Sequence, residues 1–208
     1  MILAMSFLLL STFVYHFTHQ KEAEQFNKAY RENLDSSIRN IIRMKENDLM
    51  KTTFDYCVWN EMGTFVHHPE KQWADANLNT LLSTLGCSLI AVFNEDFHLV
   101  HMEQNAADFR DGTFVLAMEP IREALKNQSK CHFYIYANAG LIEISGAPIV
   151  PSNDINRVTK PMGYFVTGRI WDKKFLKDLG DITNADIEVL PNAVLTKQPV
   201  LNDWKDVK

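Results

Sequence analysis

The stretch that decides the fold is residues 141–171, LIEISGAPIVPSNDINRVTKPMGYFVTGRIW. Its two ends, residues 141–150 and 162–171, are rich in β-branched and aromatic side chains, which favour strands. The polar run between them, residues 151–161, is bounded by two prolines, as is typical of a loop. The stretch therefore predicts two strands of one sheet joined by a long polar connection.

Further extended segments lie on both sides of this pair. Residues 131–137 (CHFYIYA) predict a preceding strand, joined to the pair by a tight hairpin turn at 138–140. Residues 88–93 (SLIAVF) and 97–102 (FHLVHM) predict a hairpin of their own. Residues 186–190 (DIEVL) predict one more short strand.

Helices are predicted between these strands. Residues 118–128 carry Pro120 in the first turn, and residues 73–85 end before Gly86. Asp172 can cap a last helix that runs through residue 179. Antiparallel hairpins that flank a helical crossover indicate an α+β fold, a PAS-like or Cache-like antiparallel sheet whose concave face and covering helix enclose a small-molecule pocket.

A long helix precedes the sheet. Residues 18–62 contain neither glycine nor proline, and apolar side chains recur there at steps of three or four. The main members of this stripe are Phe26, Tyr30, Leu34, Ile38, Ile41, Leu49, Tyr56 and Trp59. At about 1.5 Å per residue such a helix is roughly 60 Å long, so its first half is expected to form a stalk that pairs with a second stalk.

The first 17 residues, MILAMSFLLLSTFVYHF, carry no charged side chain. They favour a transmembrane helix, although a signal peptide, a signal anchor and a buried core helix stay open. The predicted division is a membrane segment at 1–17, a helical stalk at 18–48, a sensory domain at 49–190 and the start of a C-terminal continuation at 191–208.

Composition narrows the classes of partner. The 208 residues are 46% hydrophobic and 23% charged, which is ordinary for a globular protein. A formal charge of -5 without a basic block argues against a nucleic-acid partner. Cys57, Cys87 and Cys131 have no metal-type spacing; we expect buried thiols, with one disulfide as the alternative.

Several of these segments together resemble a known family. The motif DYCVWNEMGTFV (residues 55–66), the short helix after it, GCSLIAVFNEDFHLVH (86–101), and the closing strands and helix resemble a type-four CHASE domain, a cyclases/histidine kinases associated sensory extracellular domain. Two positions depart from the pattern, since Asn60-Glu61 replaces the expected Asp-Asp and Asp96-Phe97 replaces Asp-Gly. The resemblance implies an extracytoplasmic input module between membrane helices, one that serves a histidine kinase, a cyclic-di-GMP enzyme or a chemotaxis-type output.

Five residues are candidates for a ligand site. Asp55, Tyr56, Trp59 and Phe65 are expected where the long helix meets the sheet, either as a pocket wall or as packing between helix and sheet. Arg169 is expected to face Asp55 or solvent, and its partner would be a carboxylate in a structural ion pair or an anionic ligand.

Catalytic signatures are absent from the sequence, and we expect neither an enzyme nor a metal or cofactor. His98 and His101 are three apart on a predicted strand and so face opposite ways. The sequence predicts a membrane-anchored extracytoplasmic sensor that binds a small molecule and forms a homodimer through its long helix. The alternatives are a membrane-tethered hydrolase that uses His67 and His68, and a dimerisation spacer without a ligand.

Overall fold

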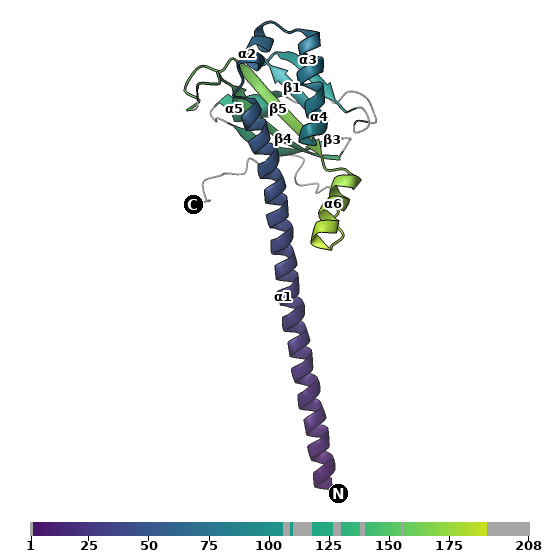
Figure 1. The fold of residues 1–208 in the computed structure, drawn as a ribbon. Coiled ribbons are helices and arrows are strands. Elements are labelled where there is room, and N and C mark those ends of the chain that lie inside the picture. Colours follow the sequence, from purple (N-terminus) through teal and green to yellow (C-terminus); the bar gives the residue numbers. More distant parts are fainter. Residues whose placement is uncertain are drawn as a thin grey trace. The chain divides into compact units, whose positions relative to one another are not determined.

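The computed structural model (Figure 1) describes residues 2–105, 109, 118–126, 130–137, 140–154 and 156–190. The chain divides into two compact units, Met1–Arg43 and Met44–Lys208. The predicted turn at 138–139, the last residues of the helix predicted at 118–128 and the tail from 191 lie outside the described residues.

Helix α1 spans Ile2–Tyr56. Its residues up to Arg43 make up the first unit, and its last turns, from Met44, belong to the second. The long Gly-free and Pro-free helix is therefore confirmed, but it ends six residues earlier than predicted. It ends there because the following backbone pairs with the sheet: the Val150 amide donates to the Cys57 carbonyl at 2.8 Å, and Val58 forms a parallel bridge with Val150. Among the helices of the described residues, none is both long enough and apolar enough to cross a membrane, so the span predicted at 1–17 is not confirmed.

Three short helices follow α1. Helix α2 (Asn60–His67) contains Gly63, which packs so closely against the Met162 side chain that an added Cβ would displace it. The helix predicted at 73–85 consists of α3 (Lys71–Asn77) and α4 (Asn79–Leu85), which meet at the buried Leu78. Helix α4 ends at Gly86 in the left-handed conformation, as predicted.

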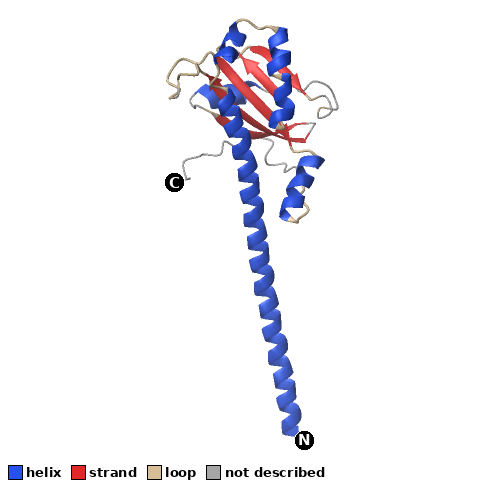
Figure 2. Cartoon of the chain, viewed as in Figure 1, coloured by secondary structure: helices blue, strands red, loops and turns tan. Residues whose placement is uncertain are grey.

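The five strands form one antiparallel sheet (Figure 2) in the order β2-β1-β5-β4-β3. Their bounds are β1 Leu89–Phe93, β2 Leu99–Gln104, β3 Cys131–Ala137, β4 Gly140–Ile149 and β5 Gly163–Ile170. The α+β fold and the hairpin order predicted from the sequence are confirmed. The strand predicted at 186–190 is wrong, because these residues form no strand in the structure.

Each face of the sheet carries its own hydrophobic core. One face packs on the end of α1 and on α2 to α4, through residues such as Leu49, Met62 and Leu78. The other face packs on α5 (Met118–Lys126) through Ile121 and Leu125. Helix α6 (Lys173–Thr183) follows β5, and the Asp172 carboxylate caps it by accepting from the Phe175 amide at 2.7 Å, as predicted.

Candidate functional site

An aromatic cluster lies where α1 joins α2. The Tyr56 and Trp59 rings are 6.2 Å apart between centroids, and Trp59 lies 5.1 Å from Trp73 of α3. Phe65 of α2 is buried and stacks on Trp73 at 4.7 Å. The structure thus brings together three of the five predicted site residues.

The route by which they meet differs from the prediction. The helix predicted at 18–62 was expected to continue through Trp59, and this is wrong because α1 ends at Tyr56. Trp59 has an extended backbone (φ -148°, ψ 116°) and precedes the first turn of α2. Asp55 is exposed at the end of α1.

Arg169 lies elsewhere on the same face of the sheet. Its guanidinium is buried and pairs with the Glu143 carboxylate, with Nε and one amino nitrogen 3.1 and 2.7 Å from Oε2. The two residues are direct cross-strand partners on β5 and β4. Of the two expectations for Arg169, the ion pair is confirmed, but its carboxylate belongs to Glu143 and not to Asp55.

Glu143 is the centre of a buried polar network. Its side chain is completely buried, His132 Nε2 lies 3.0 Å from Oε1, and Trp171 Nε1 donates to Oε2 at 3.2 Å. Since a carboxylate only accepts, His132 donates through Nε2. Side chains from β3, β5 and the residue after β5 thus surround a single carboxylate on β4.

The network extends to helix α1. The Arg169 guanidinium also donates to the Lys45 carbonyl at 2.9 Å, and the Tyr134 hydroxyl donates to the Glu46 carboxylate at 2.5 Å. Two turns further on, the Thr53 hydroxyl lies 2.6 Å from the Thr167 hydroxyl of β5. The end of α1 is therefore held on the sheet by directional polar bonds as well as by apolar packing.

Electrostatics favours the charged form of Glu143. Burial opposes the charge, but the hydrogen bond from His132 and the Arg169 guanidinium together outweigh it and lower the pKa of the Glu143 carboxyl. Burial, reinforced by the nearby carboxylates of Glu143 and Glu46, raises the pKa of the Tyr134 hydroxyl, which keeps it a donor.

Glu143, Glu46 and His132 were not among the residues predicted from the sequence. A signal for Glu143 was present, because it is the one charged side chain in the apolar run of residues 141–150. Its partner could have been found only from the register that sets Glu143 opposite Arg169.

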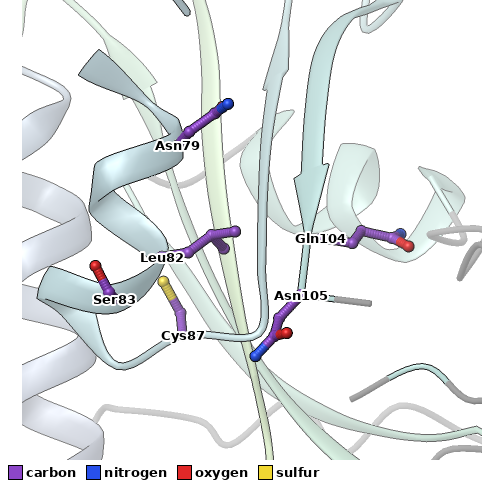
Figure 3. A pocket seen from close by; sticks show the side chains of 6 residues that line it. All are labelled: Asn79, Leu82, Ser83, Cys87, Gln104 and Asn105. Atoms are coloured by element: carbon purple, nitrogen blue, oxygen red, sulfur yellow. The ribbon is translucent and has the colours of Figure 1, made fainter. Parts of the chain in front are cut away.

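A pocket of about 350 Å³ lies between α4 and the β1–β2 hairpin (Figure 3). It is lined by Asn79, Leu82, Ser83, Cys87, Gln104 and Asn105. This volume is within the roughly 300–1,000 Å³ range of small-molecule sites, and the lining is uncharged. None of the five predicted site residues lines it.

The histidines that suggested a hydrolase are dispersed. His67 ends α2 and lies 4.0 Å from the Glu95 carboxylate, while His68 is the exposed residue after it. His101 instead lies edge-on to Phe65, 5.9 Å between ring centroids, and its burial lowers its pKa. Within the described part of the chain, no three His, Cys, Asp or Glu side chains are grouped so that they could hold a metal ion.

The fold and its relatives define the class of this protein. A family model, the CHASE4 domain, matches residues 41–190, which is most of the chain. The chain belongs to the CHASE4 domain family, as its resemblance indicated. It is therefore an extracytoplasmic sensory domain of a signalling protein, a class that is not itself enzymatic.

One solved structure supports the fold. The periplasmic domain of Vibrio cholerae LuxQ is 12% identical, with 73% of this chain and 70% of that chain covered and a TM-score of 0.51. A selenomethionine structure of the same Vibrio cholerae domain is 11% identical, with 73% and 67% covered and a TM-score of 0.46. A search of curated proteins gave no match.

Glu143→Gln leaves the buried Arg169 without its countercharge. We therefore expect the free energy of unfolding to fall by about 3–5 kcal/mol at neutral pH, measured by urea denaturation from pH 7 to pH 3. The folded pKa of Glu143 lies below the ordinary 4.5, so its contribution is present above about that pH and is lost as the pH falls through the folded pKa. The difference between wild type and variant should shrink in acid.

The matched control is Glu188→Gln, which removes the same charge from an exposed position outside the network. It should change stability by less than about 0.5 kcal/mol. A Glu143→Gln variant as stable as the wild type at neutral pH would contradict the role of the carboxylate.

Proposed function

We infer that this domain senses a small molecule and reports its presence by shifting the last turns of α1 against the sheet. The observation that carries the proposal is the set of polar bonds from Lys45, Glu46 and Thr53 to strands β3 and β5. A ligand that favours one arrangement of the sheet over another changes these bonds first. A displacement of about 1–2 Å along or around the helix axis is typical of such relays.

The proposed ligand site is the aromatic cluster of Tyr56, Trp59 and Phe65, with Asp55 at its exposed rim. Tyr56 and Trp59 are half-buried, so each ring combines apolar area with a polar group that a ligand could reach. The cluster adjoins the end of α1, and binding there would act directly on the helix. In this proposal Arg169 positions Glu143 and does not contact the ligand.

The proposed setting is a membrane-bound histidine kinase or cyclic-di-GMP enzyme that dimerises through α1. Coupling of about 1–3 kcal/mol between ligand and helix would change the output several-fold. The proposal replaces the hydrolase alternative, because His67 and His68 are exposed at the end of α2 and the family is sensory.

Ligand binding is testable on the 208-residue chain by thermal unfolding in the presence of amino acids, small carboxylates and polyols, each at millimolar concentration. A ligand present at 100 times its dissociation constant adds about 2.7 kcal/mol of stability. Trp59→Ala should abolish the rise in Tm, whereas Val158→Ala, at a position 82% exposed, should keep it. If no compound raises Tm, the ligand-free spacer is the better description.

The relay is testable without a known ligand. In the full-length membrane protein, Glu143→Gln should change the output activity several-fold because it alters the bonds that hold α1. Two glycines inserted after Asn40 should remove that effect by breaking the stiffness of the helix, while the loss of domain stability persists. An effect of Glu143→Gln that survives the insertion would refute the relay through α1.

The proposed dimer interface is the apolar stripe of α1 in the first unit. Phe26 and Tyr30 are 72% and 55% exposed there, and Leu34 and Ile38 continue the same face. Sedimentation should find a dimer of the 208-residue chain that Leu34→Asp combined with Ile38→Asp converts to monomer, since paired carboxylates oppose burial. Ser36→Asp, at an exposed position two residues from both Leu34 and Ile38 and therefore on the opposite face of the helix, is the control and should leave the dimer intact. A monomeric wild type would contradict the proposal.

A further inference from the structure

In the loop between β4 and β5, described at residues 151–154 and 156–161, the side chain of Asp154 organises the backbone. The buried Asp154 carboxylate accepts from the Val158 amide at 3.0 Å and from the Thr159 amide and hydroxyl at 2.9 and 2.5 Å. These bonds fold the chain back on itself just after Arg157. The position of Arg157 is therefore determined by the loop and not by a regular element.

Arg157 reaches from this loop to the end of α1. One amino nitrogen donates to the Phe54 carbonyl at 2.6 Å and the other to the Pro148 carbonyl at 3.1 Å. The guanidinium also lies over the Phe54 ring, 3.3 Å from its centroid. Phe54 lies in the last turn of α1, where its carbonyl also accepts from the Cys57 amide at 3.3 Å and the helix dipole favours a positive charge.

The same loop holds the chain on the other side of the junction. The Asn60 side chain accepts from the Ser152 amide at 2.9 Å, and the Ser152 hydroxyl lies 3.3 Å from the Asn60 amide. Between these contacts the Cys57 thiol is completely buried and donates to the Thr53 carbonyl at 3.1 Å. The same loop therefore contacts the chain on both sides of the junction of α1 and α2.

Two features indicate that Arg157 holds this position at an energetic cost. Its backbone is left-handed (φ 53°), a conformation that is costly for a residue with a side chain. Its guanidinium donates to two neutral carbonyls, and the carboxylates of Asp154 and Asp55 attract it only from beyond hydrogen-bond distance. Burial also lowers the pKa of Arg157, which indicates that its charge is held at a cost.

We propose that the described loop residues, 151–154 and 156–161, form a latch in which Arg157 is the positioning residue for the end of α1. When Arg157 is seated, the junction of α1 and α2 is closed. When it withdraws, the last turn of α1 and Cys57 open together while the sheet stays folded. One role of the latch, to set how firmly α1 follows the sheet, rests on the proposed relay. The existence of the latch does not depend on the relay.

The three buried cysteines provide the test. Burial raises the pKa of Cys57, Cys87 and Cys131 to about 12. Cys57 and Cys131 therefore react with N-ethylmaleimide only after the structure around them opens, whereas Cys87 lines the pocket beside α4 and reports on that surface. In the 208-residue chain, Arg157→Gln should raise the labelling rate of Cys57 at least about tenfold, because two hydrogen bonds from a charged donor are lost. The rates of Cys87 and Cys131, followed in the same sample by mass spectrometry, should stay within about twofold of wild type.

The matched control is Lys160→Gln, which removes one positive charge from an exposed position of the same loop and should leave all three rates unchanged. Equal increases at the three cysteines would show global destabilisation and overturn the latch, as would an unchanged rate at Cys57. Should Arg157→Gln fail to fold, Arg157→Lys, which keeps the charge but not the two-pronged contact, is read by the same criteria. The measurement involves no signalling output, so the latch and the relay can fail independently.

Discussion

The structure depends on a carboxylate that has no access to water. A buried charge is stable only when it is both neutralised and hydrogen-bonded, and Glu143 obtains these partners from strand β3 and from the end of strand β5. Arg169, His132 and Trp171 are thereby held at fixed positions around it. Arg169 cannot satisfy its remaining donors in the sheet, and so it reaches the Lys45 carbonyl of α1. The requirements of one charge thus extend from the middle of the sheet to the helix.

The last turns of α1 are attached to the sheet at two levels. The Glu143 network holds Lys45 and Glu46, and Arg157 holds Phe54, about 13 Å further along the axis. Leu49 packs between these levels. Directional bonds at two separated points define the rotation as well as the position of a helix, which apolar packing alone does much less strictly. This property suits a domain whose helix must report the state of the sheet.

The two faces of the sheet differ accordingly. The face beneath α5 is covered by apolar residues such as Ile121, Ile142 and Ile144. The face beneath α1 combines an apolar core around Met62 and Phe165 with the Glu143 network. Polar groups inside a core are costly unless they are fully paired. The Glu143 network places several such paired groups beneath one helix, which distinguishes the face under α1 from the face under α5.

By itself, the sequence determined the elements whose signals are local. Alternation, turn residues and the absence of glycine and proline identified the five strands and the long helix, and the family followed from the order of its motifs. Sequence patterns also placed Tyr56, Trp59 and Phe65 at one junction. Asp172 as a helix cap and Gly86 as a helix end were likewise readable, because each acts within a few residues of itself.

Only the tertiary structure decided which groups pair. Arg169 meets Lys45 across 124 positions of sequence, and Arg157 meets Phe54 across 103. The end of α1 at Tyr56 also depends on a distant strand end, Val150, that takes up its backbone. Hydrogen bonds of this kind leave no periodic trace in the sequence, because they are set by the register of the sheet and by the path of a loop rather than by neighbouring residues.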